Sequence, residues 1–218
     1  MKARDKVVFV IGRQAGYSRE IVEILEENGF ARPHEIDNLL EDAGELVQRL
    51  ARRTNGIAAT YYAAPGVPGI RQIIDGWASE HGLVPAMPLV HKSSSISSSV
   101  RLGEGTTVNR LVSIAAAVLV GKHVQINRSS SIGHDCRIGD FSSIGPGALL
   151  AGGVTVGPGS FIGAGAVLTP GLTLGENSVI GAGSVLRHPV AAFETWVGNP
   201  AKAVRVSESG YKGFTVKT

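Results

Sequence analysis

A period of six residues governs the hydrophobic positions between residues 96 and 190. Isoleucine, leucine or valine recurs at Ile96, Leu102, Val108, Ile114, Val120, Ile126, Ile132, Ile138, Ile144, Leu150, Val156, Ile162, Leu168, Leu174, Ile180 and Leu186. The position four residues later is small or aliphatic in each hexad, and glycine often follows the aliphatic residue, as in "IGDFSS" and "VGPGSF". Such a repeat is typical of a parallel β-helix in which each hexad forms one short strand and one corner.

The same period predicts how the hexads stack. Three hexads make one coil, so residues 18 apart lie on neighbouring coils at the strand spacing of about 4.8 Å. The aliphatic residue and the small residue four positions later face inward, and glycine or asparagine supplies the corner dihedrals. The pattern therefore predicts a prism of parallel strands with an aliphatic core.

The residues before the repeat predict a small α/β domain. "KVVFVIG" and "GIAATYYAA" are apolar runs typical of buried strands. "SREIVEILEENGF" predicts a helix with Ser18 as N-cap and Gly29 at its end, and further helices are expected over Leu39–Arg52 and in "GIRQIIDGWASEHG". This alternation predicts a Rossmann-like βαβ unit with a parallel sheet.

A segment rich in proline and serine, "LVPAMPLVHKSSSI", predicts the connection between the two parts. We therefore expect an α/β domain over residues 1–90 and a β-helix over residues 91–206. The polar residues 207–218 are expected to form a loose tail.

Composition and charge exclude several classes of protein. The formal net charge is only +3 and no run of lysine or arginine exceeds two residues, so nucleic-acid binding is not indicated. No stretch of about 18 apolar residues predicts a membrane span. The N-terminus lacks the features of a secretory signal, and the single cysteine, Cys136, cannot form an intrachain disulfide. A cytoplasmic location is expected.

The turn after the first predicted strand, "GRQAGYS", invites comparison with nucleotide-binding turns. It has only Gly12 and Gly16 and lacks the G-x-G-x-x-G spacing, so binding of NAD is not indicated. An anion can still bind at the start of the following helix, where N–H groups are free. Asp37 and Asn38 could reach a ribose or base from the next strand, or they could simply cap the following helix.

The stretch "SSSIGHDCRIGDF" places His134 and Asp135 at a corner of the predicted prism. A corner histidine can act as the general base for acyl transfer from a thioester, with the aspartate orienting its imidazole. Gly152 lies one coil later, has no side chain to block a thioester, and could donate its N–H to the oxyanion. The alternative is a solvated corner histidine.

The other candidate groups indicate structural roles. His123 and His188 also lie at corners, but a metal site would need three converging imidazoles, so no metal is expected. Cys136 belongs to the inward-facing series and is predicted to be a core residue and not a nucleophile.

Several motifs together resemble one family. "VIGRQAGYSREIVEIL", "EIDN", "LVHKSSSI", "SSSIGHDCRIGDF" and "WVGNPAKAVR" occur in an order similar to that of the nucleotide-sugar and sialic-acid acetyltransferases of the hexapeptide-repeat type. The resemblance implies a left-handed β-helix, acetyl-coenzyme A as cosubstrate, and a homotrimer with sites between subunits. It also implies that His134 is the catalytic histidine, Asp135 its acidic neighbour and Asn127 a further active-site residue.

This chain differs from the family's motifs at two positions, and its C-terminal segment matches a further family feature. The family's turn usually continues into His-Gly, where this chain has Tyr17 after Gly16, and Ser143 stands where the bacillosamine-pathway member has a histidine. In this family, a segment like "VGNPAKAVR" folds over the coils where coenzyme A lies. The resemblance therefore implies that Lys202 meets a phosphate, and the glycines Gly163 and Gly181 leave space for the pantetheine arm.

The resemblance and the residues predict an acetyl-coenzyme A dependent N-acetyltransferase that acts on a nucleotide-linked 4-amino sugar in bacterial surface-glycan biosynthesis. Gly12, Gly16, Asp37 and Asn38 are then substrate-binding candidates together with Asn127. Two alternatives stay open: O-acetylation of sialic acid or another sugar hydroxyl, and a trimeric scaffold without catalysis.

Overall fold

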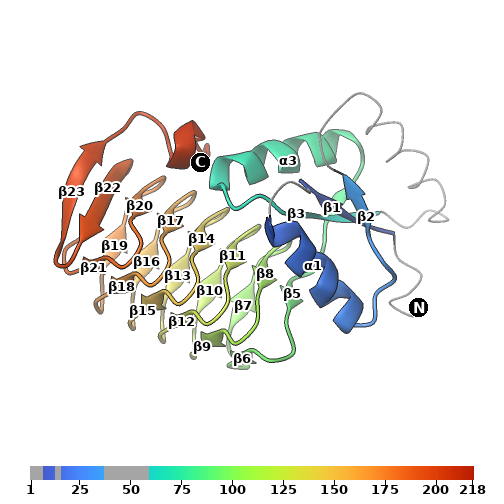
Figure 1. Ribbon diagram of the computed structural model, residues 1–218, viewed down its shortest axis with the longest axis horizontal. Coiled ribbons are helices and arrows are strands. Elements are labelled where there is room, and N and C mark those ends of the chain that lie inside the picture. Colours follow the sequence, from blue (N-terminus) through green and yellow to red (C-terminus); the bar gives the residue numbers. More distant parts are fainter. Residues whose placement is uncertain (1–6, 13–15, 37–58) are drawn as a thin grey trace.

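The computed structural model describes residues 7–12, 16–36 and 59–218 (Figure 1). Its N-terminal part is a four-stranded sheet in the order β2-β1-β3-β4, and each neighbouring pair of strands is parallel. The elements are β1 (Val8–Ile11), α1 (Gly16–Glu27), β2 (His34–Ile36), β3 (Thr60–Ala63), α3 (Pro68–Glu80) and β4 (Val84–Pro85). The expected parallel α/β unit is therefore present.

Alternation along β1 explains why helices cover both faces of this sheet. Phe9 and Ile11 pack in one core with Ile74 of α3, whereas Val8 and Val10 pack in a second core with residues of α1. Successive side chains of a strand point to opposite faces, so an uninterrupted apolar run needs cover on both sides.

The ends of α1 test two predicted signals. Gly29 has φ +81°, a left-handed conformation that ends the helix as expected. The expected cap Ser18 is wrong, because the helix already begins at Gly16 and Ser18 is buried within its first turn. The helix predicted over residues 39–52, with Asp37 and Asn38, lies outside the described residues.

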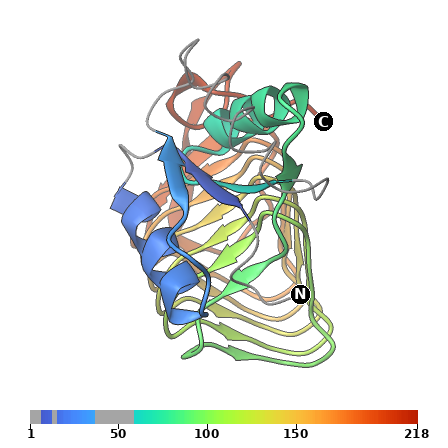
Figure 2. The ribbon, with the colours of Figure 1, turned by 90° about the vertical axis from the view of Figure 1, so that its right-hand side faces the viewer.

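The rest of the chain is a left-handed parallel β-helix of about six turns (Figures 1 and 2). One sheet contains β5 (Leu89–Val90), β8 (Thr107–Val108), β11 (Gln125–Ile126), β14 (Ser143–Ile144), β17 (Phe161–Ile162), β20 (Val179–Ile180), β22 (Glu194–Gly198) and β23 (Ala201–Val206). The second contains β6 (Ser95–Ile96), β9 (Ser113–Ile114), β12 (Ser131–Ile132), β15 (Leu149–Leu150), β18 (Val167–Leu168) and β21 (Val185–Leu186). The third contains β7 (Arg101–Leu102), β10 (Leu119–Val120), β13 (Arg137–Ile138), β16 (Thr155–Val156) and β19 (Thr173–Leu174).

Strand register confirms the predicted stacking. Ile132 pairs with Leu150, 18 residues later, and the other coils repeat this relation. The aliphatic hexad positions from Val108 to Leu186 are buried in one continuous core. The prism begins one hexad earlier than predicted, because β5 pairs with β8 and Val90 continues the six-residue spacing back from Ile96.

The expectation of a loose tail over residues 207–218 is wrong. After the antiparallel hairpin β22–β23, the chain turns back through the short helix η3 (Tyr211–Gly213). Val216 is buried, and its backbone N–H and C=O bond to the Asn177 side chain at 2.8 and 3.0 Å. The buried amide satisfies the backbone of the segment, so a polar sequence is held in place without regular structure.

Candidate functional site

His134 and Asp135 form an exposed pair at the corner after β12. The His134 Nδ1 atom lies 2.7 Å from an oxygen of the Asp135 carboxylate, and about seven-tenths of each side chain is exposed. Asp135 has φ 58°, and this left-handed turn brings two adjacent side chains together. When Nδ1–H donates to the carboxylate, the free lone pair of a neutral imidazole lies on Nε2.

Gly152 lies directly over this imidazole on the next coil. A Cβ at Gly152 would stand 2.6 Å from His134 Nε2, so a larger residue could not occupy the position without moving the ring. The Gly152 N–H has no acceptor among the described residues. The corner thus presents a ring nitrogen and a free N–H donor side by side.

Cys136, two residues after His134, points into the prism. Its side chain is buried, with Sγ 3.2 Å from the carbonyl oxygen of Ala151, and burial raises the pKa of the thiol. A buried neutral thiol is a core group, as the hexad pattern predicted.

His123 is fully buried between the two parts of the chain. Its ring lies 5.5 Å from Tyr61 and 5.3 Å from Phe141, measured between centroids, and its Nε2 is 3.0 Å from Asp75. Burial alone would raise the pKa of Asp75, but hydrogen bonds from His123 and Tyr61 together with the Lys122 charge lower it overall. This cluster joins α3 and β3 to the coils.

A cavity of about 330 Å³ lies where the carboxyl ends of β1 and β3 meet the coils. Its lining residues are Tyr17, Gly66, Gln125, Asn127, Ser143, Ile144, Gly145, Pro146, Phe161 and Ala164. The carboxyl ends of parallel strands are the usual ligand-binding edge of an open α/β sheet. We call this cavity the interdomain pocket.

Two predicted substrate-binding glycines lie beside this pocket. Gly12 follows β1 with φ +98° and donates its N–H to the Ile36 carbonyl, and Gly16 begins α1. It is the next residue, Tyr17, that lines the pocket, and burial raises the pKa of its phenol to about 12. A neutral phenol is therefore available there as a hydrogen-bond donor.

Arg71 of α3 lies behind the pocket lining and bonds to Ser143, which lines the pocket. The guanidinium is fully buried and donates to the backbone oxygens of His123, Pro65, Phe141 and Ser142 and to the Ser143 hydroxyl. Among the described residues no carboxylate pairs with it, and burial lowers its pKa to about 9. At neutral pH this guanidinium carries a positive charge directly behind Ser143.

Sequence reasoning missed Arg71, Tyr17, Gln125 and Phe161. Arg71 lies three residues before the buried Ile74 and seven before the buried Ala78, on the inner stripe of α3. A charged residue on an apolar helix stripe is a signal that was available.

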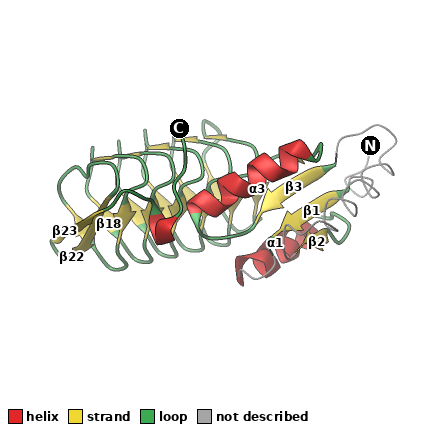
Figure 3. Ribbon diagram, turned by 90° about the horizontal axis from the view of Figure 1, so that it is seen from above, coloured by secondary structure: helices red, strands yellow, loops and turns green. Residues whose placement is uncertain are grey.

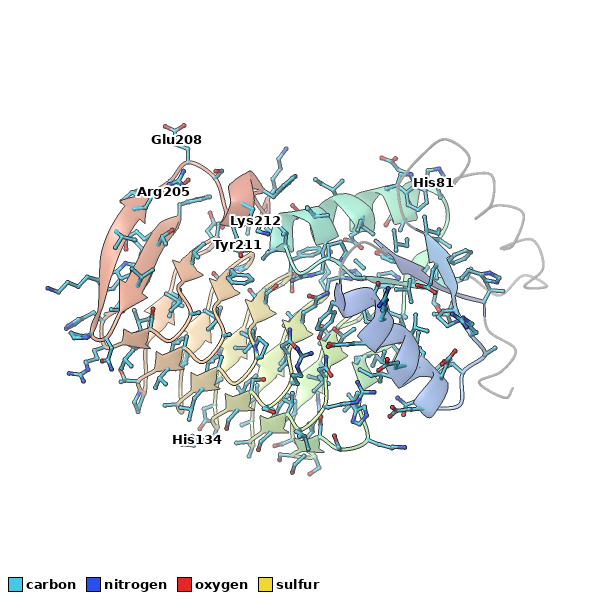
Figure 4. All side chains as sticks on the ribbon, in the orientation of Figure 1. His81, His134, Arg205, Glu208, Tyr211 and Lys212 are labelled. Carbon is cyan, nitrogen blue, oxygen red and sulfur yellow. The ribbon has the colours of Figure 1, made fainter. Side chains whose placement is uncertain are left out.

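The predicted site residues fall in different places on one chain. Asn127, in the interdomain pocket, follows β11 of the eight-stranded sheet, whereas His134 follows β12 of the six-stranded sheet, at the next corner of the coil. Figure 4 shows His134 at the outer edge of the coils, away from the N-terminal helices. A single chain therefore does not bring Asn127 and His134 together.

The residues predicted to meet coenzyme A lie toward the C-terminal end. Lys202 is exposed on β23, opposite Val197 of β22. The expected open space over the glycines is wrong: Gly163 is buried under the next coil, and a Cβ on Gly181 would lie 2.6 Å from Val197. The hairpin covers this backbone because β22 pairs with β20.

Two features are absent from the part of the chain that the structure describes. No group of three or more histidine, cysteine, aspartate or glutamate side chains there could hold a metal ion. No described helix is both long and apolar enough to cross a membrane.

Comparison with known proteins agrees with this geometry. Residues 117–152 and 153–188 match the family described as bacterial transferase hexapeptide (six repeats). The structure of PerB from Caulobacter crescentus in complex with CoA and GDP-perosamine is 32% identical, with a TM-score of 0.80 over 91% of this chain and 97% of that chain. The chain belongs to the hexapeptide-repeat nucleotide-sugar acetyltransferases. The predicted resemblance is confirmed.

Two further solved structures share the architecture. The acetyltransferase domain of PglB from Neisseria gonorrhoeae, in complex with acetyl coenzyme A, is 26% identical, with a TM-score of 0.77 over 92% of this chain and all of that chain. WeeI from Acinetobacter baumannii, at 21% identity and a TM-score of 0.77 over 91% of this chain and all of that chain, shares the fold. No curated protein matches the chain. Because the chain belongs to an acetyltransferase family, it is an enzyme and not the scaffold without catalysis that was the alternative.

Proposed function

We propose that this acetyltransferase transfers an acetyl group from acetyl-coenzyme A to the amine of a nucleotide-linked 4-amino sugar. The observation that carries the proposal is the His134–Asp135 pair beneath the free N–H of Gly152. PerB, the relative described above, binds CoA and GDP-perosamine, which is a nucleotide amino sugar. We place the reaction in bacterial surface-glycan biosynthesis in the cytoplasm.

The interdomain pocket has the chemistry to hold such an acceptor. The Arg71 charge lies behind Ser143 and is not paired with any described carboxylate, so it favours an anionic ligand, and the diphosphate of a nucleotide sugar is anionic. The first turn of α1, from Gly16, offers N–H groups to the same charge. Asp37 and Asn38 remain predicted contacts for the ribose or base.

A homotrimer would complete the site. Because one chain holds the interdomain pocket and His134 on different edges, we propose that His134 of one subunit faces the pocket and Asn127 of the next. The acceptor then lies between subunits, with its amine near His134 Nε2. We also propose that Lys202, which is exposed on the closing hairpin, meets a phosphate of coenzyme A.

The reaction is a direct transfer between two bound substrates. The amine nitrogen forms a bond to the thioester carbonyl carbon, the carbon–sulfur bond breaks, and the electron pair leaves with the sulfur. His134 Nε2 accepts the proton that the amine loses, and Asp135 stabilises the resulting imidazolium. The Gly152 N–H donates to the carbonyl oxygen while negative charge develops there.

Release of free thiol from acetyl-coenzyme A tests this proposal. The acceptors are UDP-, dTDP- and GDP-linked 4-amino sugars and sialic acid, and the variants are His134→Asn and, as a matched control at another exposed corner, His188→Asn. We expect turnover with one amino sugar, a loss of about 10²-fold or more in His134→Asn, and no loss in the control. Turnover with sialic acid alone would instead indicate O-acetylation. A fully active His134→Asn variant would show that His134 is not the general base.

A further inference from the structure

The outward-facing residues of the eight-stranded sheet form a ladder along the coils. Two separate parts of the chain, which we call the N-terminal cover and the C-terminal cover, pack on this ladder. Gln125, Ser143, Phe161 and Val179 are paired in register on successive coils. The N-terminal domain covers the early steps of this ladder and the C-terminal residues cover the later ones (Figures 1 and 3). The interdomain pocket lies where the two covers meet, since Ser143 and Phe161 both line it.

The N-terminal cover is fixed by hydrogen bonds to the ladder. The Gln125 side chain donates to the carbonyl oxygens of Ala63 and Ala64 at 3.3 and 2.9 Å. The Ser143 hydroxyl donates to the carbonyl oxygen of Gly66 at 2.9 Å and accepts from Arg71 at 3.0 Å. These bonds fix Gln125, Ser143 and Gly66, which form one wall of the pocket.

The opposite wall depends on residues 207–218, which we call the return segment. The Tyr211 ring, labelled in Figure 4, stacks on the Phe161 ring, with 3.8 Å between centroids and 8° between planes. The Asn177 side chain donates to the Val216 carbonyl oxygen and accepts from the Val216 N–H, and these two bonds hold the segment one coil beyond Phe161. Phe161 therefore faces the pocket while its position is set from behind by Tyr211.

The return segment also contacts the other cover. A Cβ on Gly69, in the first turn of α3, would lie 2.7 Å from Phe214, so helix and segment are in close contact. The Gln72 side chain exchanges two hydrogen bonds with the Lys217 backbone, both of 2.8 Å. The segment thus braces Phe161 and the loop that carries Gly66 at the same time.

We propose that the return segment determines how the acceptor sugar is held, and that Tyr211 is a positioning residue that acts through Phe161. The inference rests on the proposed function, because it takes the interdomain pocket as the acceptor site. An aromatic ring pinned by a stacked partner offers a rigid apolar surface to the C–H face of a sugar. Without Tyr211, the Phe161 side chain can leave this position and the pocket loses its wall.

Calorimetric binding of the nucleotide amino sugar and steady-state kinetics test the inference. The variants are Tyr211→Ala, Tyr211→Phe, which keeps the stacked ring, and Glu208→Ala, an exposed control in the same segment. For Tyr211→Ala we expect about tenfold weaker acceptor binding and a similar rise in the acceptor KM, with an unchanged KM for acetyl-coenzyme A. Tyr211→Phe and Glu208→Ala should behave as wild type.

Asn177→Gly provides an independent variant. Asn177 has φ 54°, which glycine adopts readily, so this change removes both bonds to Val216 while the corner is kept. It should weaken acceptor binding in the same direction as Tyr211→Ala. If wild type binds the acceptor and both variants bind it equally well, the inference is wrong and the proposed function stands. If wild type binds no nucleotide amino sugar, the inference and the proposed function are both wrong.

Discussion

The Nε2 atom of His134 stands 2.6 Å from the point that a Cβ on Gly152 would occupy, and the two residues are 18 positions apart on adjacent coils. The tip of the imidazole therefore lies close to a backbone position with no side chain. Because Asp135 engages the other ring nitrogen at 2.7 Å, the ring is held from two directions.

Gly152→Ala should abolish most activity while the fold persists. The added methyl group must displace the His134 ring, and a displacement of about 1 Å at a reacting atom can lower the rate by about 10²-fold. The turnover number and the thermal midpoint of the variant measure the two effects separately. An alanine variant with wild-type turnover would show that the observed ring position is not the productive one.

Asp135→Asn should lower turnover by about tenfold or more with little change in either KM. Asparagine tolerates the left-handed φ of 58° but removes the negative charge that stabilises a protonated imidazole. Initial rates with both substrates at saturation give the comparison. Equal rates in wild type and variant would leave Asp135 without a role in orienting His134.

The Asp75–His123 contact should make the free energy of unfolding depend on pH. The folded-state pKa of Asp75 is lowered, so its contribution is complete above the ordinary carboxyl pKa of about 3.9 and is lost as pH falls toward the folded value. At pH 7, Asp75→Asn should lower the free energy of unfolding by about 1–2 kcal/mol.

Urea titrations at pH 7 and near pH 3, at one protein concentration, measure this dependence. The difference in the free energy of unfolding between wild type and Asp75→Asn should be smaller at the lower pH. Glu208→Gln, at an exposed site, should show no difference from wild type at either pH. A difference for Asp75→Asn that widens in acid would contradict the assigned charge state of Asp75.

Cys136 should resist thiol reagents in the native protein. Its side chain is buried and burial raises the pKa of the thiol, so the reactive thiolate is both scarce and inaccessible. In urea, one equivalent of reagent should react, since the chain has a single cysteine. Rapid labelling of the folded enzyme with loss of activity would instead support a nucleophilic role.

The six-residue period was sufficient to predict the β-helix, its core and the corner that carries His134. Each hexad repeats the same local requirement, an aliphatic residue inside and a turn residue outside, so register follows from counting. The interior position of Cys136 follows from the same count. Gly29 could be predicted as a helix end because its left-handed backbone is a local property.

Tertiary structure alone decided how the corners relate to the rest of the chain. Counting places His123 and His134 at similar corners, yet the packing of α3 buries the first and leaves the second exposed. The pairs Arg71–Ser143, Tyr211–Phe161 and Asn177–Val216 join residues between 39 and 72 positions apart. The period of the hexads describes only the coils, and the contacts that build the pocket come from segments folded against them from both ends.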